Sequence, residues 1–285
     1  MSKIIDTHLH TWDLDQLEYY WLKGDESILA KSYFVADIAP QLKNANINAA
    51  ILVQATNSLA ETDWLLRLAE LNACILGTVV WLPLMQPQQV AAAIDKYKAN
   101  PYFCGVRHQI HDEVNPAWLL QPEVMESLGI LEEYDIPFDL VGTKLAHIET
   151  ALKLAHQLPN LRMVFDHLNQ PPAIDTGAYH QWKTLMIEAA QHPRFFAKIS
   201  GLGTAIGNGK QWCSKDISYA IEFIIAGFGV DRIFCGGDWP VSLLAGSYGY
   251  TWQQYQLVID DLLSVPNANK LYTTNAELFY RVKSL

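Results

Sequence analysis

The stretch KIIDTHLH, residues 3–10, begins as a short apolar strand and ends in two histidines spaced two positions apart. Side chains at alternate positions of a β-strand point to the same face, about 6.6 Å from one another. We therefore expect Asp6, His8 and His10 to share one face of this strand. Two imidazoles at the end of a strand can converge on one metal ion or on one substrate carbonyl oxygen.

Seven further apolar stretches are predicted to be strands like the first. They are AAILVQA (49–55), ILGTVVWL (75–82), FCGVRHQ (103–109), PFDLVG (137–142), RMVFDHL (162–168), FFAKIS (195–200) and RIFCGGDW (232–239). Nearly continuous apolar strands, without strict alternation, are typical of a parallel sheet that is covered on both faces.

Segments of helical period separate these strands. We expect helices over 61–72, 87–99, 122–134, 145–157, 179–191, 215–227 and 252–264, and a short one within 267–282. Such alternation of strand and helix predicts right-handed crossovers and a parallel sheet. It favours an α/β fold, a TIM-type (β/α)8 barrel, with residues 1–285 in a single domain. The long connection 11–48 is expected to be a loop over the binding site.

A doubly wound open sheet is the rival architecture, and its signatures are missing. No GxGxxG follows the first strand. The glycine-rich GLGTAIGNGK, residues 201–210, fails the spacing of a phosphate-binding loop, because Asn208 stands where a glycine is needed and Gln211 follows Lys210.

Composition limits the partners. Half of the 285 residues are hydrophobic and 18% are charged, as in globular proteins. The net charge of −10, with no cluster of basic residues, argues against nucleic acid or a membrane surface as partner. The four cysteines lack CxxC spacing, which favours free thiols. No signal peptide or apolar run of membrane-spanning length is evident, so a cytoplasmic location is expected.

Polar side chains gather at the ends of three other strands. The fourth ends in Arg107 and His108, the sixth in Asp166 and His167, and the eighth in Asp238 and Trp239. A barrel of this type builds its active site at the carboxyl ends of its strands. A buried carboxylate needs partners, and His8 and His10 are the obvious ones for Asp238.

Aromatic residues near these ends are candidates for pocket walls, which suit flat, hydroxylated ligands. They are Trp81, Trp239, Tyr20 and Trp21. For the last two, packing beneath a loop is an equal alternative. The other histidines, His111, His147, His156, His180 and His192, are expected on the surface.

Eight segments, in order, resemble the amidohydrolase-related family, and most closely its sugar-lactonase branch, which includes L-fuconolactone and L-rhamnonolactone hydrolases. They are IIDTHLHTWD (4–13), YYWL (19–22), LVQA (52–55), VVWL (79–82), GVRH (105–108), VFDHLNQP (164–171), KISGL (198–202) and FGVDRIFCGGDWP (228–240). The HxH alone is a weak signal, but the ordered set is highly specific.

The resemblance implies a barrel hydrolase in which His8, His10 and Asp238 bind water or one divalent metal, zinc above all. His167 matches the family's DHxxxP segment, and Arg107 its GxRH segment. Ligands that many relatives carry on the fourth and fifth strands are missing here, so a two-metal site is not expected. The remaining choices are a single Zn²⁺ or histidines that act on the carbonyl without metal.

These features predict hydrolysis of a small lactone, most simply that of a sugar acid. Asp238 would act as general base, while His8 and His10, directly or through a metal, stabilise the oxyanion beside His167. Arg107 and His108 would bind substrate hydroxyls or a carboxylate.

Three other functions stay open at this point. One is a metal-dependent decarboxylase, or another hydrolase of carboxylate substrates, from the same superfamily. Another is a TatD-like nuclease, against which the net charge argues. The last is a sugar-acid binder without catalysis. The sequence does not predict the oligomeric state.

Overall fold

The computed structural model describes residues 3–206 and 211–283. Eight parallel strands form one sheet in the order β1 to β8, with each strand beside its neighbour in sequence. The strands are β1(Ile5–Leu9), β2(Ala49–Val53), β3(Ile75–Val80), β4(Phe103–His108), β5(Phe138–Leu140), β6(Met163–Phe165), β7(Phe195–Ile199) and β8(Ile233–Cys235). All eight predicted strands are confirmed, although the last residues of most of them belong to the loops.

The sheet closes where β1 meets the segment after β8. Leu9 pairs with Trp239 in an isolated parallel bridge. The backbone N–H of Asp238 donates to the carbonyl of His8 at 2.7 Å, and that of His10 donates to the carbonyl of Trp239 at 2.7 Å. The predicted (β/α)8 barrel is therefore confirmed.

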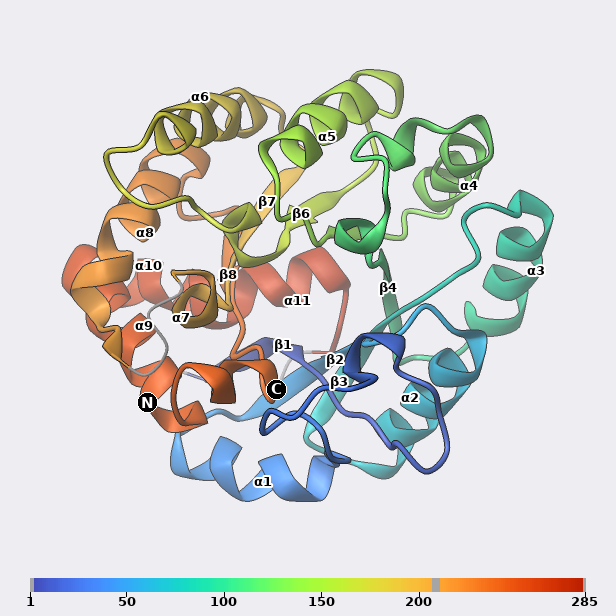
Figure 1. The fold of residues 1–285 in the computed structure, drawn as a ribbon, viewed down its shortest axis with the longest axis horizontal. Helices are drawn as coiled ribbons and strands as arrows, with labels where there is room; N and C mark the ends of the chain where they lie inside the picture. The colour runs from blue at the N-terminus through green and yellow to red at the C-terminus, as the bar shows by residue number, and fades with distance from the viewer. Residues whose placement is uncertain (1–2, 207–210, 284–285) are drawn as a thin grey trace.

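Helices surround the strands in a ring (Figure 1). In the described ranges they are α1(Val35–Asn44), α2(Leu59–Leu71), α3(Pro87–Tyr97), α4(Pro122–Glu133), α5(Leu145–Gln157), α6(Gly177–Gln191), α7(Leu202–Ala205), α8(Ser214–Phe228), α9(Tyr248–Leu262), α10(Val265–Asn269) and α11(Asn275–Tyr280). Short turns of 3-10 or π type are η1(Tyr20–Leu22), η2(Ile110–Asp112), η3(Trp118–Leu120), η4(Asp166–Asn169), η6(Val241–Leu244) and η7(Lys270–Thr274). None of these helices is long and apolar enough to cross a membrane.

Helix α1 was not predicted and lies within the connection that we expected to be a loop. Pro40 sits inside this helix. Proline lacks a backbone N–H and usually ends a helix, so the sequence around Pro40 did not predict a helix. The helix begins where the Asp37 carboxylate accepts the backbone N–H of Phe34 at 2.8 Å. The long loop is thereby reduced to residues 10–34.

A bulge in β1 overturns one expectation about the first strand. Ile5 pairs with Ala49 and Asp6 with Ala50, but the next pair is Leu9 with Leu52, so β1 uses one more residue than β2. An extra residue turns the side chains that follow it to the opposite face. Asp6 consequently does not share a face with His8 and His10, as the plain alternation predicted.

Two glycines allow β1 and β8 to approach closely. A Cβ atom on Gly236 would lie 2.4 Å from Cβ of His8. A Cβ atom on Gly237 would lie 2.5 Å from Oδ2 of Asp6. The GG pair that precedes Asp238 is thus required by the seam of the barrel.

An aromatic side chain of α11 packs against β7 and β8. The ring of Phe279 lies 4.7 Å from that of Phe196 and 5.2 Å from that of Phe234.

The four cysteines are free thiols, as predicted, with Cys104 and Cys235 buried and the other two half-buried.

Candidate active site

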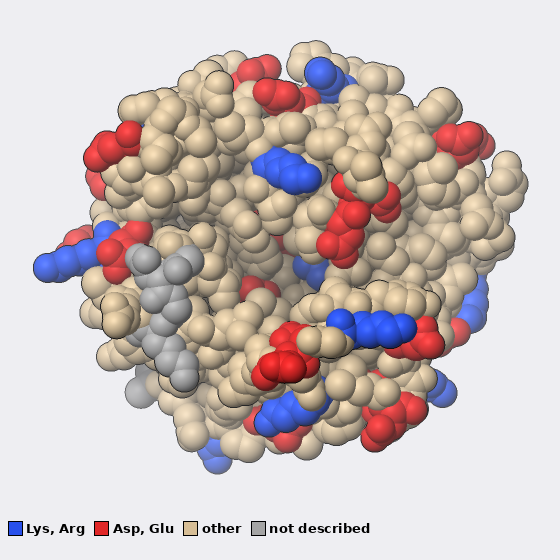
Figure 2. Space-filling view, in the orientation of Figure 1, with Lys and Arg blue, Asp and Glu red and all other residues tan. Residues whose placement is uncertain are grey.

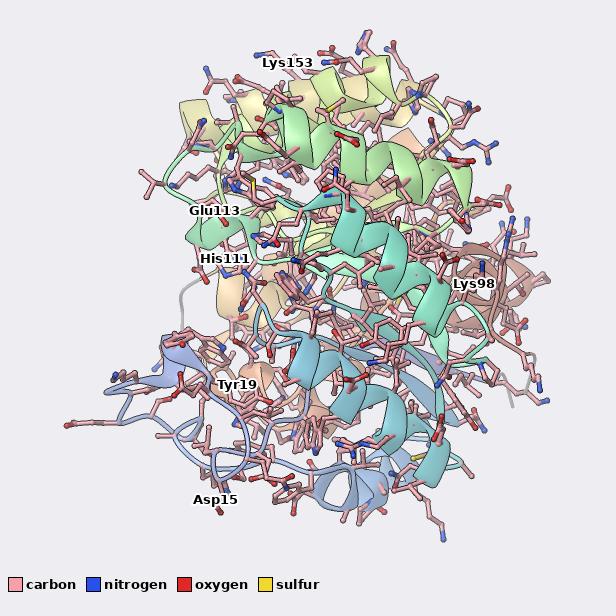
Figure 3. All side chains as sticks on the ribbon, turned by 90° about the vertical axis from the view of Figure 1, so that its right-hand side faces the viewer. Asp15, Tyr19, Lys98, His111, Glu113 and Lys153 are labelled. Carbon is pink, nitrogen blue, oxygen red and sulfur yellow. The ribbon has the colours of Figure 1, made fainter. Side chains whose placement is uncertain are left out.

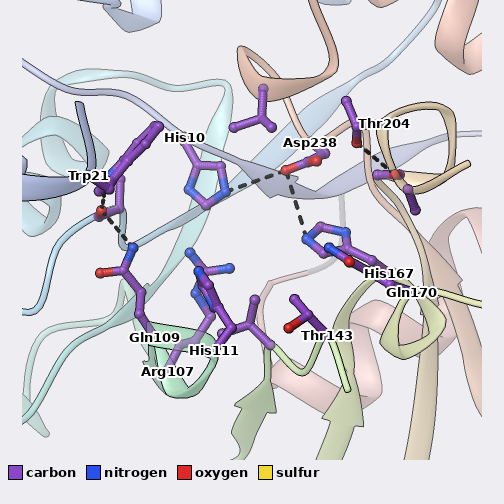
Figure 4. A pocket seen from close by; sticks show the side chains of 15 residues that line it. His10, Trp21, Arg107, Gln109, His111, Thr143, His167, Gln170, Thr204 and Asp238 are labelled. Carbon is purple, nitrogen blue, oxygen red and sulfur yellow. Dashed lines mark hydrogen bonds and ion pairs between the residues drawn. The ribbon is translucent and has the colours of Figure 1, made fainter. Parts of the chain in front are cut away.

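A pocket of about 340 Å³ opens at the carboxyl ends of the strands. Figure 2 shows a hollow in the middle of this face, with basic and acidic side chains at its bottom. In the side view of Figure 3, Tyr19, His111 and Glu113 mark this end of the barrel, and Lys98 lies toward the other. Among the described residues the lining comprises His10, Trp21, Ala55, Arg107, Gln109, His111, Val141, Thr143, His167, Gln170, Gly201, Thr204, Ala205, Asp238 and Val241 (Figure 4).

His10 and Asp238 line this pocket, and the fully buried His8 lies beside them. One potential ligand atom from each lies within 4.8 Å of the others, and all three residues are buried. Oδ1 of Asp238 is 3.6 Å from Nε2 of His10 and 3.8 Å from Nε2 of His8. Asp238 has a φ of 54°, a left-handed conformation that is uncommon outside glycine and is frequent at functional sites.

The backbone carbonyl of Val53 determines which ring nitrogen of His10 carries the proton. Nδ1 of His10 lies 2.8 Å from the carbonyl oxygen of Val53, which can only accept, so this nitrogen carries the proton. Nε2 then turns a lone pair toward Asp238. Burial lowers the pKa of His10, and it lowers that of His8 well below the usual value, so both rings are neutral.

This donor set fits a divalent metal. Two neutral imidazoles and a carboxylate match an open catalytic zinc site, in which water takes the remaining position. The bond from His10 to the Val53 carbonyl orients the ring, as outer partners do in metal sites.

His167 lies beside this group, in the turn η4 after β6. Four successive residues from His167 to Gln170 have positive φ angles, between 50° and 55°. Nδ1 of His167 is 2.9 Å from Oγ of Ser200, and Nε2 is 4.0 Å from Oδ1 of Asp238. The tight turn therefore directs the imidazole to the carboxylate.

Arg107 reaches the pocket from β4 with its guanidinium already engaged. Its NH1 lies 3.3 Å from Oδ2 of Asp166 and 3.2 Å from Nε2 of His8. Its NH2 donates to the backbone carbonyl of Gln54. These bonds fix the guanidinium plane beside His8.

Four expected substrate-binding residues lie outside the described lining. His108 is on the opposite face of β4 from Arg107, where its ring stacks on Trp118 at 4.1 Å and its Nδ1 accepts from Nε1 of Trp81 at 3.0 Å. Trp239 is buried and packs edge-on against Tyr33. Tyr20 is 73% exposed, whereas its neighbour Trp21 lines the pocket.

The sequence missed several lining residues. Gln109 follows Arg107 by two positions in the strand period, so that spacing could have found it. His111, expected on the surface, is brought to the pocket by the turn η2. Thr143, Gln170 and Thr204 lie beyond the ends of β5, β6 and β7, where periodicity no longer gives a direction.

His147 was also expected on the surface and is buried. Its Nδ1 accepts the backbone N–H of Thr143 at 3.0 Å and that of Lys144 at 3.3 Å. The ring therefore caps the start of α5. His156 and His180 are exposed, as expected, and His192 is half-buried.

Residues 5–282 match the amidohydrolase family. The chain is 28% identical to L-fucono-1,5-lactonase from Burkholderia ambifaria, over 99% of this chain and 97% of that one. It is 30% identical to an uncharacterized protein, y4mH, from Sinorhizobium fredii, over 98% of both. A solved amidohydrolase from Burkholderia multivorans, with bound zinc, superposes with a TM-score of 0.91 at 26% identity, covering 99% of this chain and 100% of that one.

Proposed function

Because the chain belongs to the amidohydrolase family, it is a hydrolase, and we propose that it opens the ester bond of a small sugar-acid lactone. The observation that carries the proposal is the convergence of His8, His10 and Asp238 at the rim of the barrel, where His10 and Asp238 line the pocket. Full-length similarity to two enzymes named L-fucono-1,5-lactonase supports the choice of a lactone.

Asp238 is proposed as the general base. Its carboxylate lies at the pocket floor with three imidazoles around it, which suits removal of a proton from a water molecule as that water attacks the lactone carbonyl. His167 is placed beside Asp238 to hold the water or the leaving oxygen by a hydrogen bond. The proton taken by Asp238 is then available to the alkoxide released on ring opening.

His8 and His10 are the proposed holders of a single divalent metal, together with Asp238. Such a metal, when bound, would supply Lewis-acid polarisation of the carbonyl oxygen. Arg107 lies next to His8 and presents a fixed positive charge to the same region, where negative charge develops during attack.

The lining supports an uncharged, hydroxylated lactone over a carboxylated one. Of the described lining residues, only Arg107 and Asp238 are charged apart from histidines. The guanidinium is held by Asp166, His8 and Gln54, so little of it is left to pair with a substrate carboxylate. The remaining polar groups are amides, hydroxyls and imidazoles, which match sugar hydroxyls.

A screen of ring opening tests this proposal. A pH indicator reports acid release from a panel of aldonolactones and carboxylated lactones, with and without a chelator. We expect turnover of at least one neutral aldonolactone, with lower activity on the carboxylated ones. Loss of rate with chelator and its return with Zn²⁺ would support the metal role. Tightly bound zinc in a protein inactive on every lactone would favour the decarboxylase alternative.

A further inference from the structure

A buried carboxylate at the start of α2 has no part in the mechanism above. Glu61 has no exposed surface. Its Oε2 accepts the backbone N–H of Ala55 at 3.0 Å and that of Thr56 at 3.0 Å, and its Oε1 lies 3.1 Å from the same N–H of Ala55. A carboxylate is costly to bury unless hydrogen bonds of this kind satisfy it. Glu61 therefore fixes the backbone of the segment that follows β2.

Capping of α2 does not account for these bonds. The sequence SLAE, residues 58–61, has the form of a capping box, in which the glutamate accepts the backbone N–H of the serine. Here the backbone N–H of Ser58 donates to the carbonyl of Thr56 at 2.9 Å. The hydroxyl of Ser58 caps the helix by accepting the N–H of Ala60 at 3.1 Å. The carboxylate of Glu61 reaches past the cap to the two residues that precede the helical segment.

The segment that Glu61 holds carries an oxygen that orients two pocket residues. The carbonyl of Ala55 accepts from Nε1 of Trp21 at 2.7 Å and from Nε2 of Gln109 at 3.1 Å. Both side chains line the pocket, and Figure 4 shows their two bonds meeting at this oxygen. Because the N–H of Ala55 bonds Glu61 and its carbonyl bonds the two side chains, a shift of this one residue would move both of them.

The anchor does not depend on whether Glu61 is ionised. Burial raises the pKa of its carboxyl to about 8, and the backbone N–H groups of Thr56 and Ala55 oppose that rise. A protonated carboxyl keeps acceptor capacity, so the bonds to the backbone are possible in both forms.

We propose that Glu61 is a positioning residue for the substrate pocket and acts through the backbone of Ala55. By fixing this residue, it sets the place of the Trp21 ring and the Gln109 amide, which line the pocket together. Glu61 itself lies behind them and has no surface with which to touch a ligand. Its effect on substrate binding rests on the proposed function, whereas its effect on Trp21 does not.

The first test observes the indole N–H of Trp21 by NMR of ¹⁵N-tryptophan-labelled full-length protein, with Trp21→Phe as the assignment. In the wild type this N–H should exchange slowly with solvent, because its hydrogen bond must open first. Glu61→Met removes both acceptor oxygens, so it should shift the signal and speed the exchange by about tenfold or more. The indole signal of Trp182, which bonds the carbonyl of Leu168 at 2.9 Å, reports whether the fold is retained.

A second variant decides the test if Glu61→Met does not fold. Both oxygens of Glu61 lie near the N–H of Ala55, so in either orientation Glu61→Gln turns its NH2 group toward this donor. Two donors then face each other, while one acceptor oxygen is kept. We expect the Trp21 signal to move in the same direction as in Glu61→Met, by a smaller amount.

The matched control is Glu132→Met on α4. The Glu132 carboxylate also accepts two backbone N–H groups, those of Asn160 at 2.6 Å and Leu161 at 3.0 Å, and it lies outside the described lining of the pocket. Its loss should leave the Trp21 signal unchanged. A Trp21 signal that moves as far in this control would show a general loosening of the fold and would overturn the proposal.

Steady-state kinetics on the best lactone of the screen gives a second readout. Glu61→Met and Trp21→Ala should each raise KM by about tenfold, with kcat changed by less than about threefold. Independent effects would multiply to about a hundredfold in the double variant, whereas effects that share one path do not multiply. We expect the double variant to raise KM by only about tenfold to thirtyfold.

Two results would refute the positioning role. One is an unchanged Trp21 signal in a folded Glu61 variant. The other is a rise in KM of about a hundredfold in the double variant, because independent sites behave in that way. If no lactone is a substrate, the proposed function fails, and the Trp21 signal alone then decides the role of Glu61.

Discussion

Gly201 shows how narrowly single residues control this site. Its φ is +58°, and a Cβ atom there would lie 2.5 Å from Nδ1 of His167 and 2.8 Å from Oδ2 of Asp238. Such distances are shorter than real contacts, and both neighbours are side chains proposed to act on the substrate. The position therefore depends on glycine for space as well as for its backbone conformation.

Gly201→Ala should lower kcat/KM by about tenfold or more, because a displacement of about 1 Å in a reacting group costs that much or more. The matched control is Gly229→Ala, which has a φ of +71° but open space around the added methyl group. Both variants should lose roughly 1–3 kcal/mol of stability from the strained backbone, by chemical denaturation, and Gly229→Ala should lie toward the upper end because its ψ of 168° is nearly restricted to glycine. Equal activity in the two variants would refute the steric account.

At the scale of elements, the seam between β1 and β8 holds the site together. The buried Asp6 carboxylate accepts the backbone N–H of His8 at 2.9 Å and that of Gly237 at 2.8 Å. It also accepts from the hydroxyl of Tyr248 at 2.8 Å and from Nε1 of Trp252 at 3.3 Å, both on α9. Asp6 thus ties β1, the segment before Asp238 and a covering helix to one anchor.

Asp6→Ala should cost at least about 3 kcal/mol of unfolding free energy, because several buried donors lose their acceptor at once. Tyr248→Phe removes only one of the four donors and should cost about 1 kcal/mol. Urea denaturation followed by circular dichroism measures both. The anchor role fails if Asp6→Ala is no more costly than Tyr248→Phe.

The loop after β1 contributes one wall of the pocket. Nε1 of Trp21 donates to the carbonyl of Ala55 at 2.7 Å, and Nε2 of Gln109 donates to the same oxygen at 3.1 Å. The loop is thereby fixed to the segment after β2. The two ends of the loop are joined by Trp12 and Tyr33, whose backbones exchange hydrogen bonds of 2.9 and 2.8 Å.

Trp21→Ala should raise KM for the preferred lactone by about tenfold, equivalent to roughly 1.4 kcal/mol of lost contact. Tyr20→Ala should change KM by less than about twofold, because that ring is exposed and outside the lining. Steady-state kinetics on the two variants tests this difference between Trp21 and Tyr20. The sequence alone predicted the same role for both. A larger effect at Tyr20 would contradict the structure.

At the scale of the whole molecule, the sequence predicts the barrel and the rim where its polar residues meet. Apolar runs and helical periods repeat eight times, and parallel strands bring their carboxyl ends to one edge. His8, His10, Arg107, His167 and Asp238 follow from that rule. What the sequence could not predict depends on backbone detail: the bulge that turns Asp6 away, the proline inside α1, and the loops that bring His111 and Thr204 to the pocket.

The most direct measurement compares lactone ring opening by the wild type and by Asp238→Asn, on the best substrate of the screen. Loss of a general base predicts a fall in kcat of about a hundredfold to ten-thousandfold. Isothermal titration of Asp238→Asn with that lactone should still show binding, because Arg107, Gln109 and Trp21 remain in place. Turnover by Asp238→Asn close to that of the wild type would contradict the account.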